Sequence, residues 1–174
     1  MNFIRIDKSN IDIAHEMENK IFPHYDAYNN YLDTFKPESK NEFWIIEVDN
    51  VYVGISGIYS YKNNDDDAWL GWFGFLEEHR NKGYGTIALK VFEEEAIKRG
   101  FKFARLFTNR YDNDDAKRFY ERNGYTEEYY ELESDPASLL YPLSIYSKSL
   151  IPGLEVPKWN NRDIHFTKQV KKQQ

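Results

Sequence analysis

One stretch of the sequence constrains the fold more than any other, because an apolar run, a glycine-containing loop and an amphipathic helix follow one another directly. Residues 68–75 are apolar, rich in aromatic side chains and glycine, and too few for most helices, which predicts a buried strand. In residues 83–99 the apolar positions recur at helical spacing, and Gly100 follows as a typical C-terminal stop. We therefore expect residues 77–82 to be a loop that joins a buried strand to a helix.

The segment before this stretch begins with two predicted short helices. Residues 11–21 carry apolar side chains at helical spacing. Ser9 and Asp12 have the pattern of a capping box, in which a hydroxyl precedes a carboxylate by three residues at a helix start. A second short helix is expected in residues 26–35, before Pro37.

Strands are predicted on both sides of the central stretch. Asp49 and Asn50 tolerate the positive φ of a tight turn, so they are expected to join two strands in a hairpin. Residues 113–123 are predicted as a helix between two later strands, which implies a right-handed parallel crossover. The strands expected besides residues 68–75 are residues 3–6, 43–48, 51–61, 101–108, 125–132 and 143–150.

The composition favours a single folded domain and excludes several classes of protein. The 174 residues include 23 Lys+Arg and 29 Asp+Glu, a net charge of -6 that argues against a dedicated nucleic-acid binder. The absence of cysteine removes thiolate nucleophiles, disulfides and cysteine-type zinc sites, and it fits the cytoplasm. We expect no export and no membrane insertion, because neither a signal peptide nor an apolar run of about 20 residues is visible.

The last part of the chain differs in charge from the rest. Residues 151–174 contain five lysines or arginines against only Glu155 and Asp163, so we predict a domain over residues 1–150 followed by a basic, solvated extension.

The loop before the long helix carries the clearest functional signal. Glycines there allow successive backbone N–H groups to converge at the helix N-terminus, where the helix dipole also favours negative charge. A pyrophosphate would fit this arrangement, although a plain tight turn would produce the same pattern. The residues concerned are Arg80, Asn81, Lys82, Gly83, Tyr84, Gly85 and Thr86.

Two familiar phosphate-binding motifs do not match this loop. The Gly-Lys-Ser/Thr ending of a nucleotide-hydrolase phosphate loop is absent. The pattern Gly83-x-Gly85-x-x-Ala88 imitates a dinucleotide fingerprint, but the acidic residue expected about 20 positions on is missing, and a meander precedes it.

Two motifs together resemble the acetyl-CoA-binding core of the GNAT family of N-acetyltransferases, over roughly residues 4–150. The first is Arg80-x-x-Gly83-x-Gly85 after a β-meander, and the second is Asn113-x-x-Ala116-x-x-Phe119-Tyr120-x-x-x-Gly124-Tyr125. The run Trp69-Leu70-Gly71-Trp72-Phe73-Gly74 also resembles an uncharacterised bacterial branch of that family.

The resemblance implies an α/β (α+β) fold with a mixed, mostly antiparallel sheet of about seven strands and helices on both faces. It implies that the backbone of Phe73 and Phe75 pairs with the pantetheine arm of acetyl-CoA and that residues 80–86 hold the pyrophosphate. Asn113 and Ala116 match cofactor-binding positions, and Tyr120 matches the proton donor to the departing CoA thiolate. A packing role for Tyr120 and an N-cap role for Asn113 stay open.

The general base and a metal are not predicted. Many relatives carry a glutamate where this chain has Trp69, and Asp67, Glu77, Glu78 and His24 are expected to be solvated surface groups. The four histidines show no ligand spacing, so no metal is expected.

The leading hypothesis is an N-acetyltransferase that moves the acetyl group of acetyl-CoA directly to a primary amine of a small molecule or peptide, because no cysteine can form an acyl-enzyme. A catalytically silent acyl-CoA-binding module is the main alternative, and a partner or nucleic-acid binder acting through the tail is a weaker one. A homodimer is a possible assembly.

Aromatic side chains predict a pocket for a cationic acceptor, with Trp69 and Trp72 on opposite faces by strand alternation. The pocket residues would come from Phe22, Tyr25, Tyr28, Tyr59, Tyr61, Trp69 and Trp72.

Overall fold

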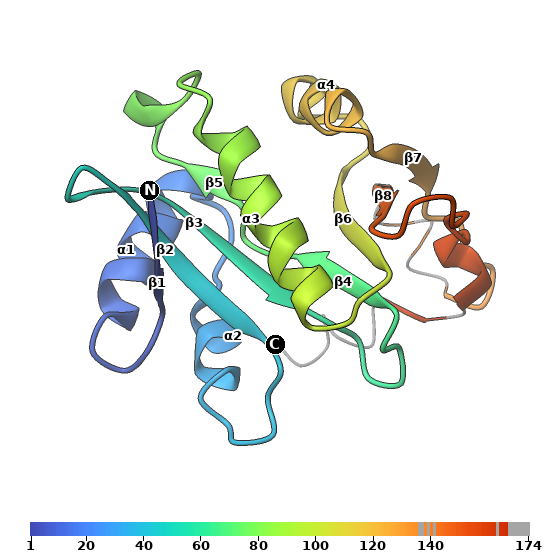
Figure 1. Ribbon diagram of the computed structural model, residues 1–174, viewed down its shortest axis with the longest axis horizontal. Helices are drawn as coiled ribbons and strands as arrows, with labels where there is room; N and C mark the ends of the chain where they lie inside the picture. Colours follow the sequence, from blue (N-terminus) through green and yellow to red (C-terminus); the bar gives the residue numbers. More distant parts are fainter. Residues whose placement is uncertain (136–137, 139, 141, 163, 167–174) are drawn as a thin grey trace. The chain divides into compact units, whose positions relative to one another are not determined.

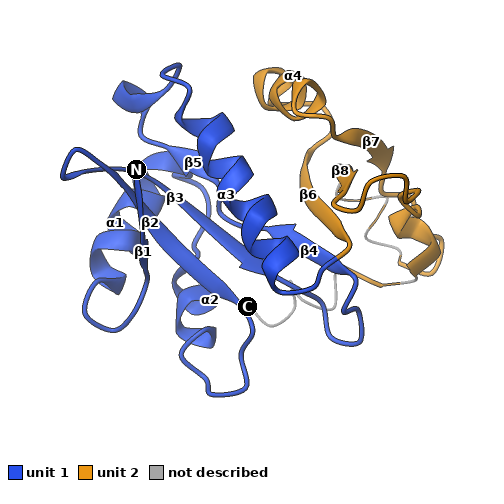
Figure 2. Cartoon of the chain, viewed as in Figure 1, with its two compact units in different colours: residues 1–101 blue, residues 102–174 orange. Residues whose placement is uncertain are grey.

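The chain divides into two compact units, Met1–Phe101 and Lys102–Gln174 (Figure 2). The computed structural model describes residues 1–135, 138, 140, 142–162 and 164–166. The first unit contains β1 (Asn2–Arg5), α1 (Ile11–Ile21), α2 (Tyr28–Asp33), β2 (Glu42–Val48), β3 (Val51–Tyr59), β4 (Asp67–Leu70), β5 (Gly74–Phe75), a 3-10 turn (Glu77–His79) and α3 (Tyr84–Lys98). The second contains β6 (Phe103–Asn109), α4 (Asp114–Arg122), β7 (Thr126–Tyr129), β8 (Leu143–Ser149) and a 3-10 turn (Trp159–Arg162).

This is the mixed α/β fold with mostly antiparallel strands and helices that the sequence predicts, with eight strands in the described residues instead of about seven (Figure 1). None of the helices in the described residues is long and apolar enough to cross a membrane.

The sheet of the first unit is an antiparallel meander. β1 pairs with β2, β2 with β3, and both β4 and β5 pair with β3. Asp49 (φ 51°) and Asn50 (φ 62°) form the tight turn between β2 and β3, as their residue types predict. The positive φ values give the turn a twist that matches that of the two strands.

The predicted strand over residues 68–75 is wrong in one respect, because it is interrupted. Ile55 pairs with Gly74 and Ile58 with Leu70, so the β4–β5 side has one residue more than β3 between these pairs. This extra residue is a β-bulge, and Trp72 within it has a φ of 45°. A bulge turns two consecutive side chains to one face, which alternation alone does not predict.

Helices cover both faces of the first unit's sheet, and α3 lies over β3 in Figure 1. On one face, Ala14 and Met17 of α1 and Tyr31 of α2 pack against Phe43 and Ile45 of β2. On the other face, a second core cluster joins Ile46, Val53, Phe75 and Ala88.

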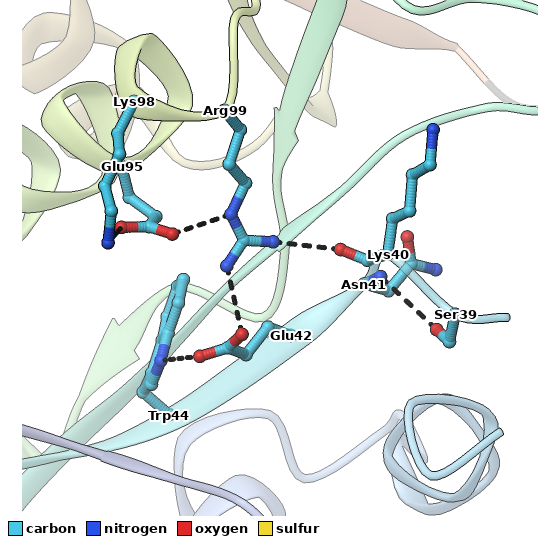
Figure 3. A network of polar contacts seen from close by, with 8 residues as sticks. All are labelled: Ser39, Lys40, Asn41, Glu42, Trp44, Glu95, Lys98 and Arg99. Atoms are coloured by element: carbon cyan, nitrogen blue, oxygen red, sulfur yellow. Dashed lines mark hydrogen bonds and ion pairs between the residues drawn. The ribbon is translucent and has the colours of Figure 1, made fainter. Parts of the chain in front are cut away.

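Arg99 connects the C-terminal end of α3 to β2 (Figure 3). Its guanidinium donates to Glu95 at 2.7 Å, to the Lys40 carbonyl at 2.9 Å and to Glu42 at 3.0 Å. Glu42 also accepts a hydrogen bond from the indole of Trp44 at 2.8 Å. The network therefore links the end of α3 to β2 and to the loop that precedes it.

The start of α1 differs from the predicted capping box. Asn10, not Ser9, is the N-cap, and it makes no side-chain cap hydrogen bond. Asp7 organises the turn instead, since its carboxylate accepts the N–H and the hydroxyl of Ser9 at 2.7 and 2.5 Å. The side chain of Asn10 accepts the N–H of Asp7 at 2.8 Å, so the local hydrogen bonds close a loop before the helix rather than a box within it.

The second unit has a three-stranded antiparallel sheet in which β8 lies between β6 and β7. Because both outer strands are antiparallel to β8, they run parallel to each other, so the strand–helix–strand segment is a crossover with one strand inserted. On one face Tyr120 of α4 packs against Tyr146 of β8, with ring centroids 5.8 Å apart.

The described part of residues 151–166 covers the other face of this sheet and is not simply a solvated extension. Trp159 is fully buried, and its backbone N–H donates to the Glu128 carboxylate at 2.7 Å. Phe166 packs on Phe107 with ring centroids 5.3 Å apart. Arg105 donates to the Pro157 carbonyl at 2.7 Å. The charged residues Asp163, Lys168, Lys171 and Lys172 of the predicted tail lie outside the described residues.

Candidate functional site

The loop predicted to hold an anion lies between β5 and α3 in the first unit. Arg80 donates from Nε to the carbonyl oxygen of Phe75 at 2.9 Å, which ties the middle of the loop to the end of β5. Asn81 (φ 58°) and Gly83 (φ 80°) both have left-handed backbone conformations. These two reversals turn the chain sharply into the first turn of α3.

The N-terminus of α3 has backbone donors available for an anion. Gly83 is its N-cap and provides no side-chain hydrogen bond, so the first N–H groups lack the partner that a Ser or Asp cap would supply. Ile87 N–H reaches the Gly83 carbonyl only at 3.5 Å. The helix dipole adds partial positive charge at the same place.

The side chains of this loop add to its positive character. Arg80 and Lys82 are exposed, as are Asn81, Gly83 and Thr86. Tyr84 is half-buried, with its ring 6.4 Å from that of Phe75, and Gly85 is half-buried as well. The seven residues singled out from the sequence therefore form one continuous, largely exposed turn, with two cationic side chains and one aromatic anchor.

Gly85 does not supply the backbone freedom for which the sequence analysis singled out the glycines of this loop. Only Gly83 of the pair has a positive φ, whereas Gly85 is part of α3 and adopts a helical conformation. The lack of a side chain, rather than backbone freedom, is what Gly85 contributes at this position.

The backbone of Phe73 and Phe75 points away from β3. Leu76 N–H bonds to the Val53 carbonyl at 2.9 Å, and polar groups in an antiparallel strand alternate in direction, so those of Gly74 face β3 and those of Phe73 and Phe75 do not. The rings of Phe73 and Phe75 pack edge to face, 5.7 Å apart, in the core cluster next to α3. The Phe75 carbonyl on this side accepts the hydrogen bond from Arg80 Nε, and pairing of this backbone with a ligand stays a prediction.

In the second unit, α4 carries the other predicted residues on one face. Asn113, Ala116 and Tyr120 are spaced three and four residues apart, which aligns them along one side of a helix. Asn113 is the N-cap with a left-handed φ of 64°, but its side chain donates to Thr108 at 3.2 Å and caps nothing. Asn113 therefore occupies the N-cap position, as the alternative prediction had it, but its side chain makes no capping hydrogen bond.

Tyr120 is buried among other aromatic rings. It is 7% exposed, and its ring lies 5.2 Å from Phe119, 6.0 Å from Tyr125 and 5.8 Å from Tyr146. Burial raises the pKa of the Tyr120 phenol above its ordinary value, so the hydroxyl keeps its proton at neutral and mildly alkaline pH. These contacts fit the packing role, and the proton-donor role stays a prediction.

The position at which many relatives carry a glutamate is occupied by Trp69, whose side chain cannot act as a general base. Trp69 is fully buried, stacked on Tyr59 at 6.2 Å and edge-on to Tyr61 at 5.2 Å, which makes it a core residue of the first unit. Glu77, Glu78 and His24 are exposed, as predicted. The prediction that Asp67 is a solvated surface group is wrong, because Asp67 is fully buried at the start of β4.

Trp72 lies on the same face of the sheet as Trp69, and the predicted opposite placement is wrong. Gly71 and Tyr59 pack against Phe43 on the face covered by α1 and α2, and Trp69 stacks on Tyr59 there. Trp72 belongs to the core cluster on that face, because the bulge adds a residue between the two tryptophans.

Trp72 is half-buried, and together with Phe22 and Tyr25 it forms a small aromatic surface, which we call the ledge. Its indole N–H donates to the Asn30 side chain at 3.1 Å, and its ring meets Phe22 at 5.7 Å and the exposed Tyr25 at 6.3 Å. Of the seven aromatic residues proposed from the sequence, the structure thus separates a buried group around Trp69 from a more accessible group around Trp72.

The sequence did not indicate a groove of about 510 Å³ in the second unit, beside β7. Arg105, Glu128, Tyr129 and Lys158 are among its lining residues, and none of the predicted site residues is. Arg105 is already bonded to Ser147 and Pro157, and Glu128 to Trp159, so these groups serve the fold of the second unit.

Comparison with known proteins places these features in context. A model of the acetyltransferase (GNAT) family matches residues 9–125, more than half of the chain. No sequence relative was found among curated proteins.

Solved structures share the fold at low sequence identity. The ribosomal-protein-S18-alanine N-acetyltransferase from Escherichia coli has a TM-score of 0.67 at 14% identity, over 91% of this chain and 99% of that one. An aminoglycoside 6′-N-acetyltransferase complexed with coenzyme A has 0.65 at 18%, over 89% and 100%. A GNAT acetyltransferase from Elizabethkingia anophelis with acetyl-CoA bound has 0.67 at 13%, over 85% and 97%.

Proposed function

The chain belongs to the GNAT acetyltransferase family, and from this premise we propose that it transfers an acetyl group from acetyl-CoA to a primary amine. The observation that carries the proposal is the loop of residues 80–86, whose two left-handed residues and uncapped helix N-terminus leave backbone donors beside Arg80 and Lys82. Such a turn suits the pyrophosphate of acetyl-CoA. Two of the structurally similar proteins were solved with coenzyme A or acetyl-CoA, which supports the same cofactor here.

The proposed reaction is direct transfer. A neutral amine attacks the thioester carbonyl, a C–N bond forms, and the C–S bond breaks as the tetrahedral intermediate collapses. The departing thiolate takes a proton from the Tyr120 phenol, which recovers it from solvent, and the ammonium formed on the acceptor loses its proton to water. No covalent acyl-enzyme thioester is available, because the chain has no cysteine.

The proposed sites divide between the two units. The backbone of Phe73 and Phe75 would pair with the pantetheine arm and residues 80–86 would hold the pyrophosphate, whereas Asn113 and Ala116 on α4 would contact the cofactor. These assignments rest on the motif resemblance and on the local geometry of each element.

The acceptor we propose is a small cationic amine, with a peptide N-terminus as the alternative. The half-buried Trp72 and the exposed Tyr25 present ring faces and edges on the first unit, and ring faces attract cations by about 0.5–2 kcal/mol each. Among the similar structures, one is an aminoglycoside 6′-N-acetyltransferase and another a ribosomal-protein-S18-alanine N-acetyltransferase, so both acceptor classes occur on this fold. A cytoplasmic location and a homodimer remain proposals, the second testable by analytical ultracentrifugation.

A catalytically silent acyl-CoA-binding module is the second candidate. The buried Trp69 favours it, because it stands where many family members carry a glutamate. Both candidates predict acetyl-CoA binding, and only the first predicts turnover.

The deciding experiment is a turnover screen with acetyl-CoA over polyamines, aminoglycosides, amino acids and peptides with free N-termini. Released CoA can be followed with a thiol reagent, and the enzyme itself gives no background because it lacks cysteine. Acetylation of at least one amine, confirmed by mass spectrometry of the product, supports the transferase. Tight acetyl-CoA binding by calorimetry, with no product over the whole panel, supports the silent module instead.

A further inference from the structure

Three potential metal ligands converge where α1 meets the segment leading to α2. His15 and Glu18 are three residues apart on α1, so they lie on one face of the helix, and Asp26 follows in the connection to α2. Nδ1 of His15 lies 3.2 Å from Oε2 of Glu18 and 3.9 Å from Oδ1 of Asp26. One ligand atom from each residue lies within 4.8 Å of the other two.

Within the described residues, the Ala27 N–H and His15 act on the buried Glu18 carboxylate, but neither meets it with ordinary hydrogen-bond geometry. Glu18 is fully buried, and neither of its carboxylate oxygens accepts a hydrogen bond of ordinary geometry from the described residues. Nδ1 of His15 is likewise buried without a hydrogen bond in that part of the chain. Buried carboxylates are normally paired or bind a metal, because an uncompensated charge is costly in the protein interior.

The charges around Glu18 do not compensate it. Burial is the largest influence on its pKa and raises it, and the nearby carboxylate of Asp26 raises it further. The Ala27 N–H and His15 lower that pKa, and no lysine or arginine of the described residues contributes to this lowering. The buried phenol of Tyr31 is affected in the same direction, since burial and then Glu18 and Asp26 raise its pKa. The cluster therefore brings two carboxylates together at a place where burial disfavours the charged form of Glu18 unless a cation joins them.

The spacing suits a small divalent ion better than a hydrogen bond. A tetrahedral ion with bonds of about 2.1 Å, as for zinc with nitrogen and oxygen ligands, holds its ligand atoms about 3.4 Å apart. The two distances from His15 Nδ1, 3.2 and 3.9 Å, bracket that value. A charge-assisted N–H···O bond between His15 and Glu18 would be shorter, about 2.7–2.9 Å.

We propose that His15, Glu18 and Asp26 bind one divalent first-row metal ion, with Zn²⁺ as the preferred ion. An imidazole and two carboxylates form a ligand set of the type that zinc takes in three-ligand sites. The Asp26 side chain is mostly exposed, so the remaining coordination position faces solvent and takes water.

Neighbouring groups hold the ligands in place. Oδ1 of Asp26 accepts the Tyr28 N–H at 2.9 Å, and the side-chain amide of Asn19 lies 3.3 Å from Nε2 of His15. In the structure the amide nitrogen Nδ2 of Asn19 faces Nε2. Turning this amide by 180° brings its oxygen there, where it would accept the Nε2 proton and leave the Nδ1 lone pair for the metal, an arrangement common for histidine ligands. The ion would cross-link α1 to the segment that carries Tyr25 and leads into α2.

The test is binding of Zn²⁺ alone to the full chain after treatment with a chelator. Calorimetry should show one ion per chain, Co²⁺ should give the visible absorption of a tetrahedral site, and Zn²⁺ should raise the melting temperature. His15→Ala, Glu18→Gln and Asp26→Asn should each weaken Zn²⁺ binding by more than about 10-fold. The matched controls are His24→Ala and Glu16→Gln, which remove an exposed histidine and an exposed glutamate nearby and should bind as the parent does.

Two outcomes overturn the proposal. One is the absence of one-to-one binding, in which case a protonated His15 paired with Glu18 accounts for the geometry. The other is Zn²⁺ binding that persists at parental affinity in both His15→Ala and Asp26→Asn. If Glu18→Gln does not fold, these two variants decide the question, since the side chains of His15 and Asp26 are 32% and 67% exposed.

Discussion

Arg80 donates from Nε to the main-chain carbonyl of Phe75 at 2.9 Å, so a side chain of the loop that precedes α3 is fastened to the backbone of β5. The bond leaves the two terminal nitrogens of Arg80 at an exposed position. It links two predicted parts of the cofactor site in the first unit, the strand end and the loop.

We predict that Arg80→Met weakens acetyl-CoA binding by about 10-fold or more, because both the loop tether and a cation are lost. Folding stability should change by less than about 1.5 kcal/mol, since one partly exposed hydrogen bond is removed. Calorimetry with CoA and thermal unfolding measure the two effects. Lys98→Met, which removes an exposed cation at the opposite end of α3, is the control and should leave CoA affinity unchanged.

The backbone conformation of Gly83 provides a second prediction with a matched control. Gly83 (φ 80°) and Gly100 (φ 87°) lie at the two ends of α3, and a Cβ at either would meet no atom within 4 Å. Gly83→Ala and Gly100→Ala should therefore cost similar stability, about 1–2 kcal/mol, from the left-handed backbone alone. Only Gly83→Ala should also weaken acetyl-CoA binding. Equal CoA affinity in the two folded variants would remove residues 80–86 from the cofactor site.

Tyr120 provides a test of mechanism. Tyr120→Phe should lower kcat by about 10²- to 10⁴-fold with little change in CoA affinity, the range for positioned proton transfer. Tyr146→Phe is the control, because it removes the hydroxyl of the neighbouring buried tyrosine. Since burial raises the pKa of Tyr120 above its ordinary value of about 10, ionisation of this phenol should cause no loss of kcat between pH 7 and about pH 10. Parental turnover in Tyr120→Phe would assign the residue to packing.

Local sequence patterns predicted the elements that depend on local physics. The helical spacing before Gly100 and the turn types at Asp49 and Asn50 are confirmed, because amphipathic spacing and positive-φ turns are encoded over a few residues. The bulge at Trp72 was missed, since one inserted residue shows only in the register against β3. The Ser9 box failed because Asp7, just upstream, competes for the same donors.

The candidate site shows the same division. The glycines and the motif spacing indicated residues 80–86, but nothing in the sequence indicated that Arg80 reaches back to Phe75, because such a bond depends on how the loop closes. The convergence of His15, Glu18 and Asp26 was also missed, and the sequence led us to expect no metal. Ligand spacing along one helix is visible in a sequence, whereas a third ligand delivered by a following loop is not.

The two tryptophans on the face covered by α1 and α2 should respond differently to truncation, because one is fully buried and the other only half-buried. Trp69→Ala should cost about 3–5 kcal/mol of unfolding free energy, since it removes a fully buried ring stacked on Tyr59 and leaves a cavity. Trp72→Ala should cost less and should raise KM for the best amine of the screen, because its ring forms the ledge with Tyr25. Chemical denaturation and steady-state kinetics separate the two effects. If Trp72→Ala keeps the parental KM for a cationic amine, or if the preferred acceptor is an anion, the ledge is not part of the acceptor site and Trp72 is a packing residue like Trp69.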